Sequence, residues 1–144
     1  LVSRAEEIGR TPYEVLIVAS LVQAEVLPED MRKAAAVVYN RLDDDMPLQF
    51  DSTVSYALGI TELQLSAEQL ETESNYNTYQ NTGLPPTPIN SPGEAAMEAA
   101  LDPAKAEWLY FVTVNPDTRE TKFARDYDRF LKLKSQLQES APSS

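Results

Sequence analysis

Apolar residues repeat at helical spacing near the start of the chain. Over residues 12–26 they recur at Val15, Val18 and Val22, which places them on one face of a helix because each residue advances ~100°. The Thr-Pro-Tyr-Glu stretch that begins at Thr11 has the composition of a capping box with proline in the first helical turn. The pattern therefore predicts a helix from residue 12 to about residue 26.

Further helical patterns and one strand pattern follow. Short apolar faces bounded by Pro, Gly and capping residues predict helices, and an apolar run that begins at Trp108 predicts an antiparallel hairpin across an Asn-Pro-Asp turn. The expected elements are a lead-in helix within 1–10, helices over 28–42, 52–58, 66–71, 91–101 and 126–138, and strands over 108–114 and 120–124.

Three of these helices have recognisable starts. Asp51 is expected to cap the helix over 52–58, and Gly59 is expected to end it. Ser66 and Ser91 each stand three residues before a Gln or Glu, which is the spacing of a capping box. These signals predict where the helices begin more firmly than the apolar pattern does alone.

The elements together indicate an α+β fold that is mostly helical, with one small antiparallel β-hairpin. Two stretches lack helical or strand periodicity: a short segment over 46–50 and a long loop over 74–93 that is rich in Asn, Tyr, Thr and Pro. Loops this long within compact domains are often functional. The second stretch is therefore a candidate part of a functional site.

Composition narrows the chemistry. The 144 residues suit one domain, and 42% of them are hydrophobic, enough for a folded core. Acidic residues outnumber basic ones by 23 to 12, for a net charge of -11, which argues against duplex nucleic acid or an anionic membrane as the main partner. The chain has no His and no Cys, which excludes Ser-His and Cys-His nucleophiles, thiolate metal sites and disulfides.

One carboxylate interrupts the first apolar face. Glu25 follows Val22 by three positions and so lies on the same face, whereas Gln23 points elsewhere. Partial burial and the negative end of the helix both raise the pKa of a carboxyl, and a protonated carboxyl at neutral pH can act as a general acid. The alternative is that Glu25 simply ends the helix with its carboxylate in solvent.

Several stretches occur together and in the order found in one family. They are "VASLVQAE", "AAVVYNRL", "MPLQFDSTVSYALG", "NYNTYQNTGLPPTPINSPGEAAMEAALDPAK" and "WLYFVTVN…ETKFA". The chain resembles the YceG-like (MltG) endolytic murein transglycosylases over roughly residues 13–124. Many relatives carry an E-x-E pattern where this sequence has Gln23-Ala24-Glu25, so Glu25 is the only acid left at that position. The resemblance implies a lysozyme-like or lytic-transglycosylase-like domain with Glu25 as catalytic acid and base.

The resemblance also implies a set of substrate-binding residues. Gln49 would lie in the cleft and bond a sugar amide or hydroxyl, whereas Asp51 is either a cleft residue or a helix cap. Soluble lytic transglycosylases and goose-type lysozymes have a comparable Tyr-Asn element, by which Asn77 would orient substrate or Glu25 and Tyr76 or Tyr79 would stack on a sugar. The alternative for the two tyrosines is packing within the loop. Ser52 could cap a helix or line the cleft, and Tyr39 and Asn40 could face the cleft, whereas Arg41 is expected to be a surface or loop-pinning residue.

By resemblance, the reaction is cleavage between MurNAc and GlcNAc in peptidoglycan glycan strands, with formation of 1,6-anhydroMurNAc ends. Glu25 would serve first as acid and then as base, without a metal or other cofactor. Two alternatives stay open. One is a lysozyme-type hydrolase with Asp51 as second carboxylate, and the other is a glycan-binding module that organises cell-wall synthases without cutting.

The resemblance gives expectations about location and partners as well. The sequence has no run of ~18 apolar residues and does not begin with Met, so residues 1–144 are interpreted as one catalytic domain of a longer protein. Residues 1–10 would lead in from an upstream region with a single transmembrane anchor, and residues 139–144 would fray. The domain would face the outside of the cell membrane, with cell-wall synthases (penicillin-binding proteins) and divisome or elongation proteins as partners.

Overall fold

The computed structural model describes residues 2–60, 65–115, 118 and 120–140, and within them the fold is α+β, as predicted. Helices surround a single two-stranded antiparallel sheet in these parts of the chain. The elements are α1 (Val2–Glu7), α2 (Pro12–Glu25), the 3-10 helix η1 (Pro28–Asp30), α3 (Met31–Asp43), α4 (Asp51–Leu58), α5 (Ala67–Leu70), α6 (Glu94–Leu101), β1 (Tyr110–Asn115), β2 (Glu120–Ala124) and α7 (Tyr127–Ser140).

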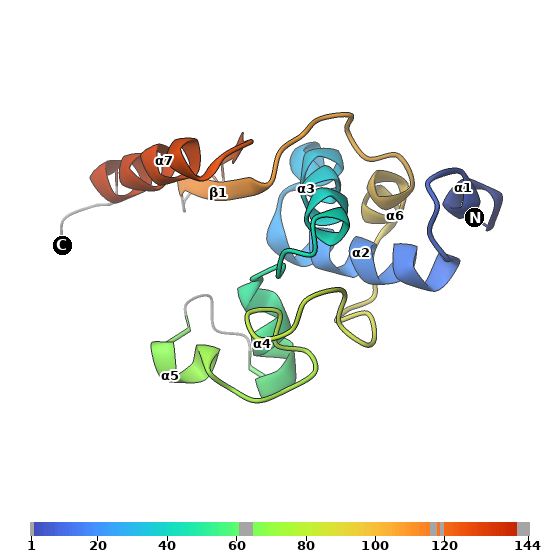
Figure 1. Ribbon diagram of the computed structural model, residues 1–144, viewed down its shortest axis with the longest axis horizontal. Coiled ribbons are helices and arrows are strands. Elements are labelled where there is room, and N and C mark those ends of the chain that lie inside the picture. The colour runs from blue at the N-terminus through green and yellow to red at the C-terminus, as the bar shows by residue number, and fades with distance from the viewer. Residues whose placement is uncertain (1, 61–64, 116–117, 119, 141–144) are drawn as a thin grey trace.

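The core lies where α2, α3 and α6 pack together (Figure 1). Helix α2 is buried from Ile17 to Val22 on nearly every side, because α3 and α6 cover it and the 74–93 loop closes over it. The α6 helix contributes small residues, Ala96, Ala99 and Ala100, which let α2 and α3 approach closely. Because α2 is packed this deeply, it holds its last residue rigidly in place.

The hairpin and α7 form an arm that extends to one side of this core (Figure 1). Tyr110 pairs with Ala124 and Phe111 with Phe123, which is the antiparallel pairing that the sequence predicts. The Asn-Pro-Asp turn lies partly outside the described residues. Leu133 of α7 and Ala124 bury each other in a small second cluster, so α7 is fixed to the sheet rather than to the main core.

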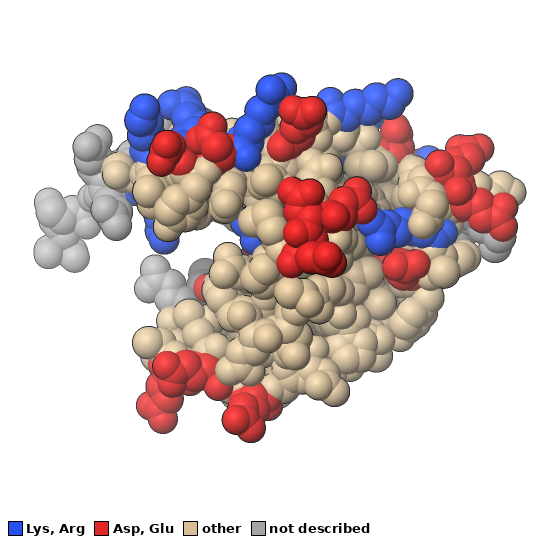
Figure 2. All heavy atoms as spheres, in the orientation of Figure 1, with Lys and Arg blue, Asp and Glu red and all other residues tan. Residues whose placement is uncertain are grey.

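A lobe of α4, α5 and the long loop lies below the core in the same view (Figure 1). The predicted absence of regular structure over 74–93 is confirmed, and buried threonines fasten this loop to α4. Thr53 and Thr78 share a hydrogen bond of 2.9 Å between their hydroxyls, and the Phe50 N–H donates to the Thr78 hydroxyl at 2.8 Å. The surface is hollowed between this lobe and the arm (Figure 2).

Two predicted helix starts are confirmed. The Thr11 hydroxyl accepts from the Glu14 N–H at 3.1 Å while the Glu14 carboxylate accepts from the Thr11 N–H at 3.0 Å. Ser66 and Gln69 form the same reciprocal pair at the start of α5. Gly59 ends α4 in the left-handed region at φ 69°, as expected of a glycine at that position.

Two other predicted starts are wrong. Asp51 is the first helical residue of α4 rather than its cap, and Phe50 precedes it without a side-chain cap. Ser91 does not open α6, because Gly93 is the capping residue and its N–H donates to the Gln23 side-chain oxygen at 3.0 Å. In both cases the side chain that the pattern suggested does not cap the helix.

The remaining boundaries differ by a few residues. The helix expected over 28–42 begins with the 3-10 turn η1 before α3. Helix α7 begins at Tyr127 and continues to Ser140, so residues 139–140, predicted to fray, are helical, and residues 141–144 lie outside the described part. No helix within the described residues is long and apolar enough to span a bilayer.

Candidate active site

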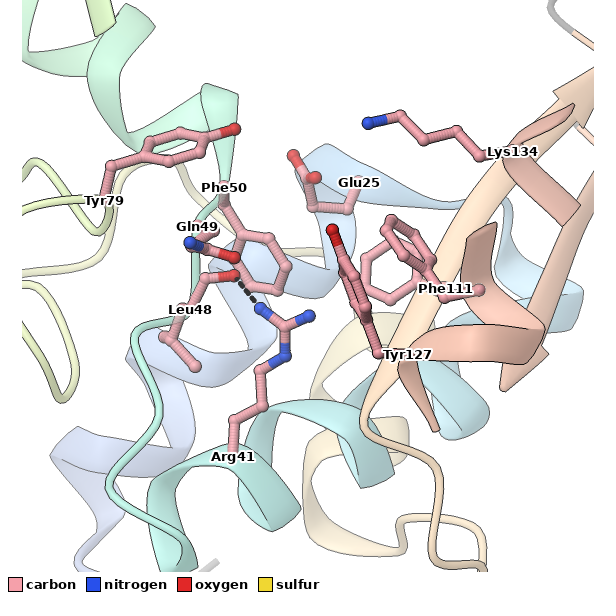
Figure 3. Close-up of a pocket in the computed structure, with 10 residues that line it drawn as sticks. Glu25, Arg41, Leu48, Gln49, Phe50, Tyr79, Phe111, Tyr127 and Lys134 are labelled. Carbon is pink, nitrogen blue, oxygen red and sulfur yellow. Dashed lines mark hydrogen bonds between the residues drawn. The ribbon is translucent and has the colours of Figure 1, made fainter. Parts of the chain in front are cut away.

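A cavity of about 310 Å³ opens where the core, the lobe and the arm meet. Its walls come from the end of α2, from α3 and the segment after it, and from the long loop, β1 and α7, so residues far apart in sequence meet there. Figure 3 shows the lining side chains. They are Glu25, Arg41, Leu48, Gln49, Phe50, Tyr79, Phe111, Tyr127, Phe130 and Lys134.

Glu25 is the last residue of α2, and its carboxylate points into this cavity (Figure 3). The helix face that leads to it is buried, since Val18 is 0% exposed and Val22 is 1% exposed, as the spacing predicts. Glu25 itself is half-buried. The rigid α2 therefore delivers one carboxylate, partly removed from water, to the cavity wall.

Gln23 points away from the cavity, as the helical spacing predicts. It is exposed, and its side-chain oxygen accepts the Gly93 N–H at the start of α6. The residue two positions before Glu25 thus joins α2 to α6 on another face. An acid at that position would lie outside the cavity.

Arg41 is a buried guanidinium that ties three segments together beside the cavity. It donates to the carbonyls of Leu109 (2.6 Å), Pro47 (3.1 Å) and Leu48 (2.7 Å), the last of which appears in Figure 3. Burial lowers the pKa of Arg41, and the guanidinium lies over the Tyr110 ring at 5.2 Å. These bonds pin the 47–48 segment and the chain before β1, a role that the sequence left open for Arg41. Arg41 also lines the cavity.

Gln49 lines the cavity, as predicted, from an unusual backbone conformation. Its φ of 57° lies in the left-handed region, which non-glycine residues rarely adopt. The Gln49 N–H donates to the Thr78 carbonyl at 3.2 Å, and Arg41 holds the preceding Leu48 carbonyl. These bonds hold Gln49 in this conformation, and such conformations concentrate at functional sites.

Asp51 and Tyr79 form a pair across 28 positions of sequence. The Tyr79 hydroxyl donates a hydrogen bond to the Asp51 carboxylate. Tyr79 lines the cavity, whereas Asp51 is not among its lining residues. Burial, the bond to Asp51 and the negative charges of Asp51 and Glu25 all raise the pKa of Tyr79, so its hydroxyl keeps its proton at neutral pH.

Asn77 corrects the expectation drawn from the resemblance. It is 0% exposed, its amide donates to the carbonyls of Leu70 (2.9 Å) and Thr72 (2.7 Å), and its oxygen accepts the Tyr79 N–H (2.9 Å). With all of these groups engaged, Asn77 reaches neither the cavity nor Glu25 directly. Its role is to shape the loop that carries Tyr79.

Tyr76 and Ser52 also stand apart from the cavity. The Tyr76 hydroxyl shares a hydrogen bond of 2.8 Å with the Thr87 hydroxyl, and its ring lies 5.0 Å from that of Tyr56. This is the loop packing that the sequence left open as the alternative. The Ser52 hydroxyl is buried and has no hydrogen-bond partner within the described residues.

Tyr39 and Asn40 serve the fold instead of the cleft. The buried Tyr39 hydroxyl donates to the Ala100 carbonyl at 2.7 Å and so joins α3 to α6. The Asn40 amide donates to the carbonyls of Ala106 and Trp108, at 2.9 and 2.8 Å, and fixes the chain that enters β1. Neither side chain lines the cavity that holds Glu25, and backbone carbonyls accept the hydrogen bonds that both donate.

The α7 residues of the cavity were missed by sequence reasoning. Tyr127, Phe130 and Lys134 are three and four positions apart and so share one helix face. In Figure 3 the Tyr127 hydroxyl and the Lys134 ammonium both point toward Glu25. The spacing was a usable signal, but nothing in it says that this face turns toward α2.

Metal chemistry has no visible basis in the described residues. Within them, no group of three or more Asp or Glu side chains is arranged to hold a metal ion. The only carboxylate among the described residues that line the cavity is Glu25. What this site can do is transfer a proton to or from a bound molecule whose apolar faces contact Phe111, Tyr127 and Phe130.

The fold and the site together define an α+β domain with one carboxylate in a partly aromatic cavity. The chain belongs to the YceG-like family, whose model matches residues 2–136.

Relatives of known name support the same assignment. The chain is 42% identical to the endolytic murein transglycosylase of Bacillus subtilis (strain 168) over 119 residues, 81% of this chain and 33% of that protein. It is 42% identical over 108 residues to the protein of the same name from Streptococcus pneumoniae (strain D39), covering 71% of this chain and 20% of that protein. The chain thus spans a third or less of the length of these curated relatives.

A solved structure shares the fold. The crystal structure of a yceG-like protein from Listeria monocytogenes superposes with a TM-score of 0.85 at 39% sequence identity. The match covers 91% of this chain and 43% of the Listeria chain.

Proposed function

We propose that this chain is the catalytic domain of an endolytic murein transglycosylase, which cuts peptidoglycan glycan strands between MurNAc and GlcNAc and leaves 1,6-anhydroMurNAc ends. The names of the B. subtilis and S. pneumoniae relatives support the substrate class. The observation that carries the chemistry is the single carboxylate, Glu25, at the end of a rigid helix in the cavity.

One carboxylate suffices for this reaction. Glu25 donates its proton to the glycosidic oxygen, and the bond to the MurNAc anomeric carbon breaks with its electron pair on that oxygen. The Glu25 carboxylate then accepts the proton of the C6 hydroxyl as that oxygen bonds to the anomeric carbon. Glu25 ends protonated as it began, and intramolecular attack replaces attack by water.

A lysozyme-type hydrolase is the weaker alternative. Hydrolytic glycosidases ordinarily use two carboxylates that flank the scissile bond. Asp51 was the candidate for the second one, but its carboxylate accepts a hydrogen bond from the Tyr79 hydroxyl, and Asp51 is not among the residues that line the cavity. This arrangement favours the transglycosylase, in which the substrate supplies the nucleophile.

The composition of the product distinguishes the two reactions. Digestion of purified glycan strands in water enriched in heavy oxygen is expected to give 1,6-anhydro ends that carry no label and are lighter than reducing ends by one water. Mass spectrometry of the new ends measures this directly. Labelled reducing ends would mean hydrolysis and would overturn the proposed mechanism, whereas no cleavage at all would favour a non-catalytic glycan-binding module.

Gln49 is expected to bond the bound glycan through its side-chain amide. Replacing Gln49 with Ala keeps a Cβ on the left-handed backbone and removes the rest of the side chain, including the amide. We expect turnover to fall roughly 10- to 1,000-fold, as losses of orienting or transition-state hydrogen bonds often do. Steady-state kinetics on glycan strands checks this.

Gln80→Ala is the matched control for this substitution. Gln80 is an exposed glutamine of the long loop that does not line the cavity. It should keep native turnover. If the two variants had equal turnover, Gln49 would have only a structural role.

Location and partners follow from the same proposal. A domain that cuts peptidoglycan works on the outer side of the cell membrane, and we propose an upstream single transmembrane helix as its anchor. Cell-wall synthases and the divisome or elongation proteins are the expected partners, since new strands must be cut where they are made.

A further inference from the structure

Tyr79 stands out because its side chain has a hydrogen bond of its own, to Asp51, separate from the one that holds its backbone. Tyr79 is already fixed through its backbone, whose N–H donates to the buried Asn77 oxygen. The separate bond from its hydroxyl to Asp51 fixes a side-chain atom at the cavity wall. A bond that orients one oxygen in a cavity beside a candidate acid suggests a task for that oxygen.

The direction of this hydrogen bond decides what the oxygen can do. The Tyr79 hydroxyl donates its hydrogen bond to Asp51, so the electron pairs of the Tyr79 oxygen are left for the cavity. Figure 3 shows this oxygen pointing toward the Glu25 carboxylate. A phenol held in this way presents partial negative charge, strengthened by the carboxylate behind it.

Proton transfer by Tyr79 itself is disfavoured. Burial, Asp51 and the charge of Glu25 all raise the pKa of its hydroxyl, so it neither ionises near neutral pH nor gives up its proton readily. Glu25 therefore carries out both proton transfers. The role left for Tyr79 is electrostatic stabilisation.

We propose that Asp51 positions the Tyr79 oxygen so that it stabilises the positive charge that develops at the anomeric carbon of the sugar being cleaved. This inference rests on the proposed function, because the charge arises only if Glu25 protonates the glycosidic oxygen. The glycosidic oxygen is bonded to the anomeric carbon. The electron-rich Tyr79 oxygen, which points toward Glu25, therefore also faces the reacting carbon. Oriented dipoles at a developing charge are a major source of catalysis. Tyr79 is then a catalytic residue and Asp51 a positioning residue.

Tyr79→Phe is the decisive substitution, because it keeps the ring and removes only the oxygen. Ring stacking on a sugar would survive it, whereas charge stabilisation would not. We expect kcat to fall about 10- to 100-fold with KM within about threefold of native, as for loss of one oriented group in the transition state. The assay uses glycan strands and the intact protein.

Asp51→Asn and the double variant test the coupling. Asp51→Asn should lower kcat by a similar factor, and Asp51→Asn with Tyr79→Phe should be no slower than Tyr79→Phe alone, because the carboxylate acts through the hydroxyl. Titration of carbon-13-labelled tyrosine by NMR gives a readout separate from activity. Asp51→Asn should move the Tyr79 titration to lower pH.

Tyr76→Phe is the matched control, since it removes a hydroxyl from the same loop that bonds Thr87 instead of a cavity neighbour. It should leave kcat within twofold of native. Native kcat in Tyr79→Phe, an equal loss in Tyr76→Phe, or additive losses in the double variant would each overturn the inference. Labelled reducing ends, or turnover that survives Glu25→Gln, would instead overturn the proposed function, so the two failures are distinct.

Discussion

Replacing Glu25 with Gln is expected to abolish cleavage while the fold survives. The amide keeps the size of the side chain but can neither donate the first proton nor accept the second. General acid–base catalysis contributes typically about 10²- to 10⁴-fold, and because one residue carries both steps we expect a loss of at least ~1,000-fold. Product release from glycan strands measures the loss, and thermal unfolding should show a Tm that holds or rises, since a partly buried carboxylate has been removed.

Gln23→Glu is the matched control for this experiment. It introduces an acid two residues away, where the side chain still accepts the Gly93 N–H at the positive end of α6. Turnover should stay within about twofold of native. Rescue of Glu25→Gln by Gln23→Glu would show that the wrong residue had been assigned.

The sequence was informative wherever local rules govern the structure. The Thr11 and Ser66 capping boxes, the left-handed Gly59 and the pairing of the hairpin all depend on residues within a few positions of one another. The placement of Glu25 also followed from spacing alone, because helical geometry fixes which residues share a face.

Long-range polar contacts were out of reach. Tyr39, Asn40 and Asn77 are residue types that suit a sugar cleft, yet each bonds backbone carbonyls. Partly buried carbonyls at helix ends and in loops need donors, and the sequence does not say which side chains supply them. Asp51 shows the same limit, since it is the first residue of α4 rather than its cap and accepts a hydrogen bond from Tyr79 in the long loop.

The cavity itself depends on how separate parts of the chain are packed. Phe111 comes from β1, and three more lining residues come from α7, which packs against the sheet. The spacing of the three α7 residues shows that they share a helix face. The packing of the second small cluster around Leu133 sets which way that face points. Composition narrowed the chemistry and helical spacing placed the candidate acid, whereas the opposite wall of the cavity required the fold.

Asn77→Ala is expected to be the most destabilising single change in the long loop. The substitution removes an amide that is 0% exposed and leaves two carbonyls and the Tyr79 N–H without their partner. A buried polar group left unsatisfied costs about 1–3 kcal/mol, so we expect a loss of about 3–5 kcal/mol in the free energy of unfolding. Urea or thermal denaturation measures this.

Asn81→Ala is the matched control for the expected loss of stability in Asn77→Ala. Asn81 is an exposed asparagine of the same loop whose amide also donates to backbone carbonyls, those of Ser74 (2.9 Å) and Asn77 (3.2 Å). Water can replace its bonds, so we expect a loss below about 1 kcal/mol.

If Asn77 acts only by shaping the loop, turnover in Asn77→Ala should recover toward native at low temperature, where more of the variant stays folded, or with an added osmolyte. Native stability with reduced turnover would mean instead that Asn77 reaches the substrate, contrary to the bonds that enclose it.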